Sequence, residues 1–247
     1  MAIYVMSDIH GQYETFKTML VEIGFNKKDH LYILGDVIDR GPDGIKTLLY
    51  CMEHQDNITL LMGNHEDMMI KSINIFKKDE MDQMLNRDVT VNWLYCNGGH
   101  ITYTEFLKQD NSTQSKIEDF LNNLSYYKII ENENKIKTVL IHAGLSTEYT
   151  DSLERILEYS IKSEDIIWYR DYYDSNLDYE MNHNPILKDT IVIHGHTPTA
   201  DGKIQCINNR IYNIDCGCAR IKNLGCLRLD DMKEFYIPVI TEVEGSW

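Results

Sequence analysis

The first 65 residues alternate between short apolar runs and longer segments with one apolar face. The apolar runs predict strands at Ala2–Met6, Leu31–Leu34 and Ile58–Met62. Between them, apolar residues recur at helical spacing in Tyr13–Ile23 and Ile45–Met52. Strands that alternate with helices in this order predict an α/β fold with a mainly parallel sheet.

A polar segment follows each of these predicted strands directly. The three segments are Ser7–Gly11, Gly35–Gly41 and Gly63–Glu66. The carboxyl ends of parallel strands lie at one edge of a sheet, and open α/β proteins bind their ligands there. We therefore expect the three segments to converge on one site.

The pattern changes in the middle of the chain. From about residue 67 to residue 124, polar segments rich in Lys, Glu and Asn predict a helical insertion, although a surface bundle fits its outer parts equally well. Strands are predicted to resume at Tyr126–Ile130, Thr138–Ile141 and Thr190–Ile193, followed by hairpin turns at Asn208-Asn209 and Asp230-Asp231. No repeat or linker divides the chain, so residues 1–247 are predicted to form one domain.

Composition argues against several classes of protein. The net charge of −15 disfavours a nucleic-acid-binding surface, because such affinity comes largely from neutralised phosphates. No apolar run approaches the roughly 20 residues of a membrane span, and the first residues lack the features of a signal peptide. The six cysteines show no paired C-x-x-C spacing, which predicts mostly buried thiols and a reducing cytoplasm.

Six polar motifs carry the residues suited to chemistry. They are Asp8-Ile9-His10-Gly11, Gly35-Asp36-Val37-Ile38-Asp39-Arg40-Gly41, Gly63-Asn64-His65-Glu66, His142-Ala143-Gly144-Leu145, Trp168-Tyr169-Arg170 and His194-Gly195-His196-Thr197. A single Asp at a strand end is more often a turn-former or helix cap than a ligand. Five strand-to-loop junctions place Asp, Asn or His at one edge of the sheet. A shared site explains this better than chance does. Such ligands suit manganese, iron or zinc, and a bridging carboxylate is the usual way to hold two ions about 3.5–4 Å apart.

In this order, the motifs resemble those of the metal-dependent phosphoprotein phosphatases within the calcineurin-like metallophosphoesterases (GDxHG, GDxVDRG, GNHE, HGGL, WxR and GHT). The resemblance spans residues 7–197, with a similar tail at residues 213–217, and a segment containing Trp93, Asn97-Gly98-Gly99 and Thr102 is similar to the bacterial branch. It implies a four-layer α/β/β/α sandwich with central β-sheets and a helical insertion. Three positions depart from the motifs: Ser7, Ile38 and Ala143. Ala143 matters only if its backbone needs a positive φ.

The resemblance implies a role for each matching residue. Asp8 and His10 bind one metal ion, Asp36 bridges two, and the second ion is completed by Asn64, His142 and His196. His65 is implied as the general acid, with Asp39 orienting its ring. Arg40 and Arg170 are implied as phosphate-binding groups beside Asn64. The implied cofactors are two divalent ions per chain, manganese first and iron or zinc as alternatives. His194 is interpreted as a supporting or structural residue.

The implied reaction is phosphomonoester hydrolysis by a metal-bridging hydroxide, with a serine/threonine or tyrosine protein phosphatase as the first interpretation. The alternative is a symmetrical diadenosine tetraphosphate hydrolase, which shares the motifs. Its adenine would need aromatic partners, and the candidates are Trp93, Tyr95, Tyr103, Tyr126 and Tyr127, which we interpret first as ordinary core residues. A pseudo-phosphatase that only binds phosphoproteins is less favoured, because every ligand position is filled and His65 and both arginines are present. The expected partner is a phosphorylated protein or a small phosphate ester, with no nucleic acid and no membrane.

Overall fold

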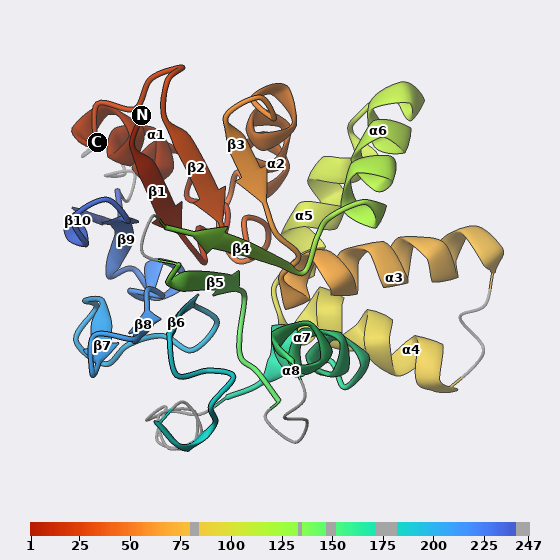
Figure 1. Ribbon diagram of the computed structural model, residues 1–247. Coiled ribbons are helices and arrows are strands. Elements are labelled where there is room, and N and C mark those ends of the chain that lie inside the picture. The colour runs from red at the N-terminus through yellow and green to blue at the C-terminus, as the bar shows by residue number, and fades with distance from the viewer. Residues whose placement is uncertain (80–83, 133–134, 147–151, 171–181, 241–247) are drawn as a thin grey trace.

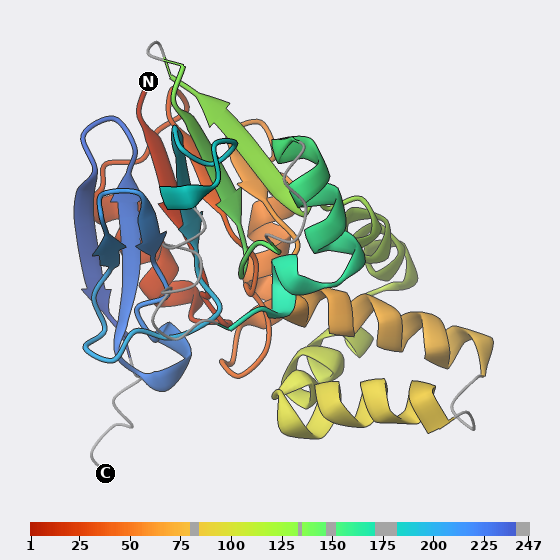
Figure 2. The same cartoon turned by 60° about the horizontal axis from the view of Figure 1, so that its bottom comes forward.

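A computed structural model describes residues 1–79, 84–132, 135–146, 152–170 and 182–240. Within these residues, ten strands form two five-stranded sheets (Figure 1). The second view shows the sheets beside each other, with helices on their outer sides (Figure 2). The chain is therefore a mixed α/β protein built on a pair of sheets.

The first sheet contains the three strands predicted near the N-terminus and has the order β10-β9-β1-β2-β3. Its parallel strands are β1 (Ile3–Met6), β2 (His30–Ile33) and β3 (Ile58–Leu60). The late strands β9 (Asn223–Arg228) and β10 (Lys233–Pro238) add to its edge in antiparallel orientation. The sequence pattern did not predict that the two late strands would join this sheet, with β9 paired to β1 and β10 to β9.

The second sheet has the order β4-β5-β6-β8-β7. Its parallel strands are β5 (Lys137–Ile141), β6 (Thr190–His194) and β8 (Ile211–Asn213). The antiparallel strands β4 (Tyr127–Glu131) and β7 (Gln205–Ile207) close its two edges. Each sheet therefore contains three adjacent parallel strands, and the loops after their carboxyl ends hold most of the candidate residues.

Three hydrophobic clusters mark the boundaries between four layers. One lies between the sheets and contains Val5, Leu140 and Ile193. Another joins the first sheet to α1 (Tyr13–Glu22) and α2 (Gly44–Glu53). The third joins the second sheet to α7 (Leu153–Lys162) and α8 (Asp165–Trp168). The α/β/β/α sandwich that the resemblance implied is confirmed.

Strand β1 shows why these strands read as nearly continuous apolar runs. Val5 faces the second sheet, whereas Tyr4 and Met6 belong to the cluster beneath the helices. Successive side chains of a strand point to opposite faces, so a strand buried on both faces needs apolar residues throughout.

Helices fill the stretch predicted as an insertion: α3 (Asn64–Lys78), α4 (Met84–Val91), a π-helix (Asn92–Cys96), α5 (Gly99–Leu107) and α6 (Asn111–Asn122). In both views α3 and α4 lie side by side and extend away from the sandwich (Figures 1 and 2). The helical stretch begins at residue 64, earlier than expected, because the third motif itself starts α3. Residues 80–83 of the predicted insertion lie outside the described residues, and its status as an insertion into one domain stays a prediction.

The short-range predictions hold closely. The predicted hairpins join β7 to β8 and β9 to β10, and Asn208 and Asn209 have the positive φ values that such tight turns require. Ala143 does not have a positive φ, so its replacement of glycine imposes no strain.

All six cysteines are free thiols, and four of them are buried. Within the described ranges, no helix is long and apolar enough to cross a membrane.

Candidate active site

The structure brings all ten predicted residues to the carboxyl ends of the parallel strands. Eight are buried, namely Asp8, His10, Asp36, Asp39, Asn64, His65, His142 and His196. Arg40 and Arg170 are exposed beside them. The buried set is suited to holding ions, whereas the arginines can reach a substrate in solvent.

Six of the ten residues have a left-handed backbone, which is uncommon for residues other than glycine. They are Asp8, His10, Asp36, Asp39, Arg40 and His196, with φ between 48° and 69°. Each such conformation costs on the order of 1–3 kcal/mol and persists only where the surroundings enforce it. Backbone hydrogen bonds between the two loops do so here, including His10 N to Asp36 O at 2.9 Å and Gly41 N to His10 O at 3.0 Å.

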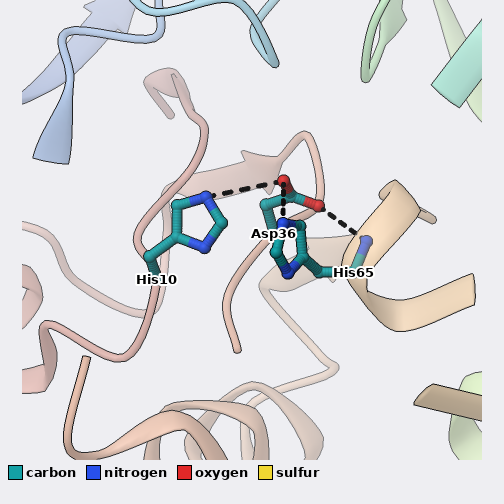
Figure 3. A group of neighbouring side chains, drawn as sticks. All are labelled: His10, Asp36 and His65. Atoms are coloured by element: carbon teal, nitrogen blue, oxygen red, sulfur yellow. Dashed lines mark hydrogen bonds and ion pairs between the residues drawn. The ribbon is translucent and has the colours of Figure 1, made fainter. Parts of the chain in front are cut away.

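The carboxylate of Asp36 lies at the centre of the cluster. Its Oδ2 is 3.5 Å from Nε2 of His10 and 3.8 Å from Nε2 of His65 (Figure 3). Its Oδ1 lies 3.5 Å from Nε2 of His142 on the other side. One carboxylate oxygen thus faces each group of histidines, the arrangement expected of a bridging ligand.

The second group contains Asn64, His142 and His196. Nε2 of His142 lies 2.9 Å from Oδ1 of Asn64 and 3.1 Å from Nδ1 of His196. The Nδ1 of His142 lies 2.6 Å from the carbonyl of Leu34, and this contact places the ring proton on Nδ1 and the lone pair on Nε2. The lone pairs of Asn64 Oδ1, His142 Nε2 and His196 Nδ1 therefore converge between these three side chains.

Asp8 connects the two sheets at the site. Its Oδ2 accepts hydrogen bonds from the Ser7 hydroxyl at 2.5 Å and from the backbone N–H of His196 at 2.9 Å. Its Oδ1 lies 3.9 Å from Nε2 of His10. Because Oδ2 is already occupied by two donors, Oδ1 is the oxygen better placed to bind an ion.

Burial keeps the histidines in the neutral form that binds metal ions. It lowers the pKa of His10 well below its usual value, and the charges of His65 and Arg40 lower it further. Burial is also the main cause of the lowered pKa values of His142 and His196. The Nδ1 of His10 lies 3.0 Å from the Ile38 carbonyl, which directs its other nitrogen to the site.

Several carboxyl groups are buried close together. Burial, then the negative charge of Asp8, raises the pKa of both Asp36 and Asp215. Burial also raises the pKa of Glu66 to about 8, with the charge of Asp36 adding to the effect. Such a concentration of acidic groups is unfavourable alone, and a bound cation offsets it.

His65 belongs to a second set of contacts. Its Nδ1 lies 2.6 Å from Oδ2 of Asp39, which also accepts the indole N–H of Trp93 at 2.9 Å. Burial raises the pKa of Asp39 to about 7, whereas hydrogen bonds from Thr102 and Trp93 and the charge of Arg40 oppose the increase. Burial lowers the pKa of His65, and the charges of Arg40, His142 and Arg170 add to this effect.

The donor atoms fit divalent ions. Two trios, His10–Asp36–His65 and Asp36–His142–His196, each place three ligand atoms within 4.8 Å of one another. Nε2 of His65 and Nε2 of His196 are buried without a hydrogen-bond partner. The first trio contains His65, whereas the resemblance assigned Asp8 to that ion and His65 to proton transfer. We retain the predicted assignment because the free Oδ1 of Asp8 also faces His10.

Each arginine contacts the cluster through Nη1. Nη1 of Arg40 lies 2.8 Å from Nε2 of His10, and Nη1 of Arg170 donates to the His196 carbonyl at 3.3 Å. Both guanidinium groups keep further donors for a phosphate, whose oxygens match their planar geometry.

Sequence reasoning missed the residues that support this cluster. Glu66 accepts the backbone N–H groups of Gly63, Asp36 and Val37, at 3.2, 2.8 and 2.9 Å. Trp93 and Thr102 hold Asp39, and Ser7 holds Asp8. Glu66, Trp93 and Thr102 lie within the quoted segments, and Ser7 stands where the family motif has a glycine. The contacts of these four residues depend on the fold. A buried Asp215 was likewise given no role.

The aromatic residues proposed for adenine binding occupy different environments. Trp93 is fully buried, and Tyr103 packs against it and stacks on Phe76. The interpretation of these two as core residues is therefore the better one. Tyr95 is 76% exposed, whereas Tyr126 and Tyr127 are half-buried and pack against the cluster of the second sheet.

Comparison with known proteins agrees with the fold. The family described as calcineurin-like phosphoesterase matches residues 1–225. A symmetrical bis(5'-nucleosyl)-tetraphosphatase of Buchnera aphidicola is 28% identical over 187 residues, which cover 72% of this chain and 59% of that protein. The enzyme of the same name from Chromobacterium violaceum is 26% identical, and the aligned region covers 96% of this chain and 95% of that enzyme.

The structural comparison gives the same fold. A solved structure described as a candidate diadenosine tetraphosphatase superposes with a TM-score of 0.62 at 16% identity, over 97% of this chain and 94% of that one. With most of its length matched by the family, the chain belongs to the calcineurin-like phosphoesterases. Within that family, the chain is similar to proteins named symmetrical tetraphosphatases, although it spans about three-fifths of the Buchnera relative.

Proposed function

We propose that the protein is a two-metal hydrolase that cleaves dinucleoside tetraphosphates symmetrically. The observation that carries this proposal is the similarity to the Chromobacterium tetraphosphatase over nearly the full length of both proteins. The sequence motifs ranked a protein phosphatase first, and the curated relatives support the second interpretation better.

The proposed ligands are Asp8 and His10 for one ion and Asn64, His142 and His196 for the other, with Asp36 shared. These residues would hold two divalent ions, whose chemistry would be to lower the pKa of a bound water from about 15.7 towards about 7 and to offset the negative charge of the phosphate. The fit of these residues rests on Asn64 Oδ1, His142 Nε2 and His196 Nδ1, which converge beside the Asp36 carboxylate.

The other residues act directly on the substrate. Arg40 and Arg170 bind phosphate oxygens from the exposed side of the site, so their charges counter those of the polyphosphate chain. To donate a proton from Nε2 to the leaving group, the His65 ring must be doubly protonated, and the Asp39 carboxylate at Nδ1 favours that form against the effect of burial. Overall acidity of the surface makes these arginines the main local attraction for an anion.

A second candidate, phosphomonoester hydrolysis, is favoured by the His65–Asp39 pair. Symmetrical cleavage expels a nucleoside diphosphate, and a phosphate oxygen with a pKa of about 6 needs little protonation. A serine or alkyl alcohol is a far poorer leaving group and gains most from an acid. A buried His–Asp pair beside Asp36 is therefore suited to phosphomonoesters as well.

The deciding experiment is an assay of the metal-reconstituted protein on diadenosine tetraphosphate and on a panel of phosphoserine, phosphothreonine and phosphotyrosine peptides. Chromatography of the nucleotide products is expected to show ADP alone, with a kcat/KM well above that for every peptide. Formation of ATP and AMP, or faster hydrolysis of a peptide, would overturn the proposed substrate.

A further inference from the structure

Four positions in one segment of the helical region support the loop between β2 and α2, three by direct contact and the fourth, Gly99, by packing against Trp93. The segment runs from Trp93 to Thr102 through the π-helix and the start of α5. Its contacts with this loop involve Asp39 and Arg40, the residues proposed to support proton transfer and phosphate binding. We call residues 93–102 the support segment.

Two of the four positions hold Asp39 directly. The indole N–H of Trp93 donates to Asp39 Oδ2 at 2.9 Å, and Asp39 donates its backbone N–H to Oγ1 of Thr102 at 2.9 Å. The Trp93 side chain and Thr102 are both fully buried. The carboxylate oxygen bonded by Trp93 is the same oxygen that lies 2.6 Å from Nδ1 of His65.

The other two positions are glycines whose missing side chains allow close packing. Gly98 has φ +80°, and a Cβ there would lie 3.0 Å from the backbone nitrogen of Arg40. A Cβ at Gly99 would overlap the indole ring of Trp93. Alanine at Gly98 would press on Arg40, and alanine at Gly99 would displace Trp93.

We propose that Trp93 is a positioning residue for proton transfer, which holds the Asp39 carboxylate so that the His65 ring presents Nε2 to the leaving group. The proposal rests on the acid role of His65 in the proposed function. Any buried indole N–H needs an acceptor, but the acceptor of Trp93 is the same Asp39 oxygen that contacts Nδ1 of His65. The helical region thereby contributes to the chemistry without contacting the substrate.

The test uses two aryl phosphates that differ in leaving group, so it does not depend on the natural substrate. Phenyl phosphate expels a phenolate that needs a proton more than the p-nitrophenolate of p-nitrophenyl phosphate does. We compare kcat/KM on both for the metal-reconstituted wild type, Trp93→Phe, His65→Ala and Tyr103→Phe. Tyr103 is the matched control, because its ring packs on Trp93 at 5.9 Å between centroids but it has no role in the site.

The expected result is a selective loss. Trp93→Phe should lower kcat/KM for phenyl phosphate by about 10-fold to 100-fold, the value of one hydrogen bond to a charged group, and that for p-nitrophenyl phosphate much less. His65→Ala should show the same selectivity with a larger loss, and Tyr103→Phe should change neither. Gly99→Ala should reproduce the Trp93→Phe pattern. Metal analysis should find equal ion content in wild type, Trp93→Phe and Tyr103→Phe.

A second readout follows the bond itself. In the protein reconstituted with diamagnetic Zn²⁺, the proton between His65 Nδ1 and Asp39 should give a far-downfield ¹H NMR signal that shifts in Trp93→Phe, disappears in His65→Ala and is unchanged in Tyr103→Phe. Equal losses on both aryl phosphates in Trp93→Phe, or no loss, would overturn the proposal. An unselective His65→Ala would overturn it together with the acid assignment. Selective losses without cleavage of diadenosine tetraphosphate would support it and refute only the proposed substrate.

Discussion

The backbone N–H of His196 donates to Oδ2 of Asp8 at 2.9 Å, across 188 positions of sequence. His196 follows β6 in the second sheet, and Asp8 follows β1 in the first. This bond therefore ties the carboxyl edges of both sheets at the candidate metal centre. The Ser7 hydroxyl donates to the same oxygen at 2.5 Å, so the orientation of Asp8 depends on both sheets.

Removing the Ser7 hydroxyl should weaken metal binding, because Asp8 would lose one of the two donors that orient it. Ser7→Ala is expected to raise the Kd for Mn²⁺ by about 10-fold, the lower end of the effects seen for groups that orient metal ligands. Isothermal titration calorimetry measures this directly. Ser72→Ala is the matched control, since Ser72 is buried and its hydroxyl has no partner. Equal Kd values for all three proteins would contradict the role of Ser7.

Glu66→Gln should destabilise the fold near Asp36. The carboxylate accepts three backbone N–H groups, whereas an amide has one acceptor oxygen and turns its own N–H donors towards the remaining groups. The free energy of unfolding should fall by about 1–3 kcal/mol, as measured by urea denaturation. Glu105→Gln is the comparison, because Glu105 accepts a single backbone N–H, that of Ile45 at the start of α2. A smaller loss for Glu66→Gln than for Glu105→Gln would refute this account.

His65→Ala separates the two roles that the geometry allows for His65. If His65 is the acid, the purified variant should keep two ions per chain while losing about 10²–10⁴-fold of its activity on an alkyl phosphate. His10→Ala should lose an ion by the same metal analysis. Loss of an ion from His65→Ala would instead make His65 a ligand, as its place in the trio with His10 and Asp36 permits.

The hairpin between β9 and β10 should show a pH-dependent contribution to stability. Two hydrogen bonds from Arg228, at 2.8 and 2.7 Å, lower the pKa of Asp231 to about 2. The unfolded value is about 3.9, so this stabilisation is complete above that pH and is lost as the pH falls towards 2. Urea midpoints should be lower for Asp231→Asn than for wild type from pH 5 to pH 7, with the gap narrowing below pH 4. The exposed Asp119→Asn on α6 should show no such gap, and a gap that is constant down to pH 3 would exclude the mechanism.

Local pattern predicted much of the fold because its signals are local. Apolar runs located β1, β2 and β3 to within two residues, and paired asparagines located the turn between β7 and β8. The pairing of β9 with β1 could not be predicted in this way, because it joins segments more than 200 residues apart. The sandwich came from the resemblance of the motifs.

In the candidate site, too, some residues could be named from local sequence, whereas the functions of others depend on the folded chain. Asp8, Asp36 and His65 could be named because each lies in a motif directly after a strand. The functions of Ser7, Trp93 and Thr102 could not, because each depends on one atom meeting another in the folded chain. Trp93 reads as an ordinary core aromatic from its neighbours in sequence, and only its contact with Asp39, 54 positions away, gives it a role.

The account rests on a two-ion centre organised by Asp36, whose carboxylate faces histidines on both sides. The most direct measurement is the ion content of purified, Mn²⁺-reconstituted wild type and Asp36→Asn, read by plasma mass spectrometry alongside hydrolysis of p-nitrophenyl phosphate. Wild type should hold two ions per chain, and Asp36→Asn should lose occupancy of both sites together with its turnover, because the shared charge is gone. Two retained ions and near-normal turnover in Asp36→Asn would contradict the account.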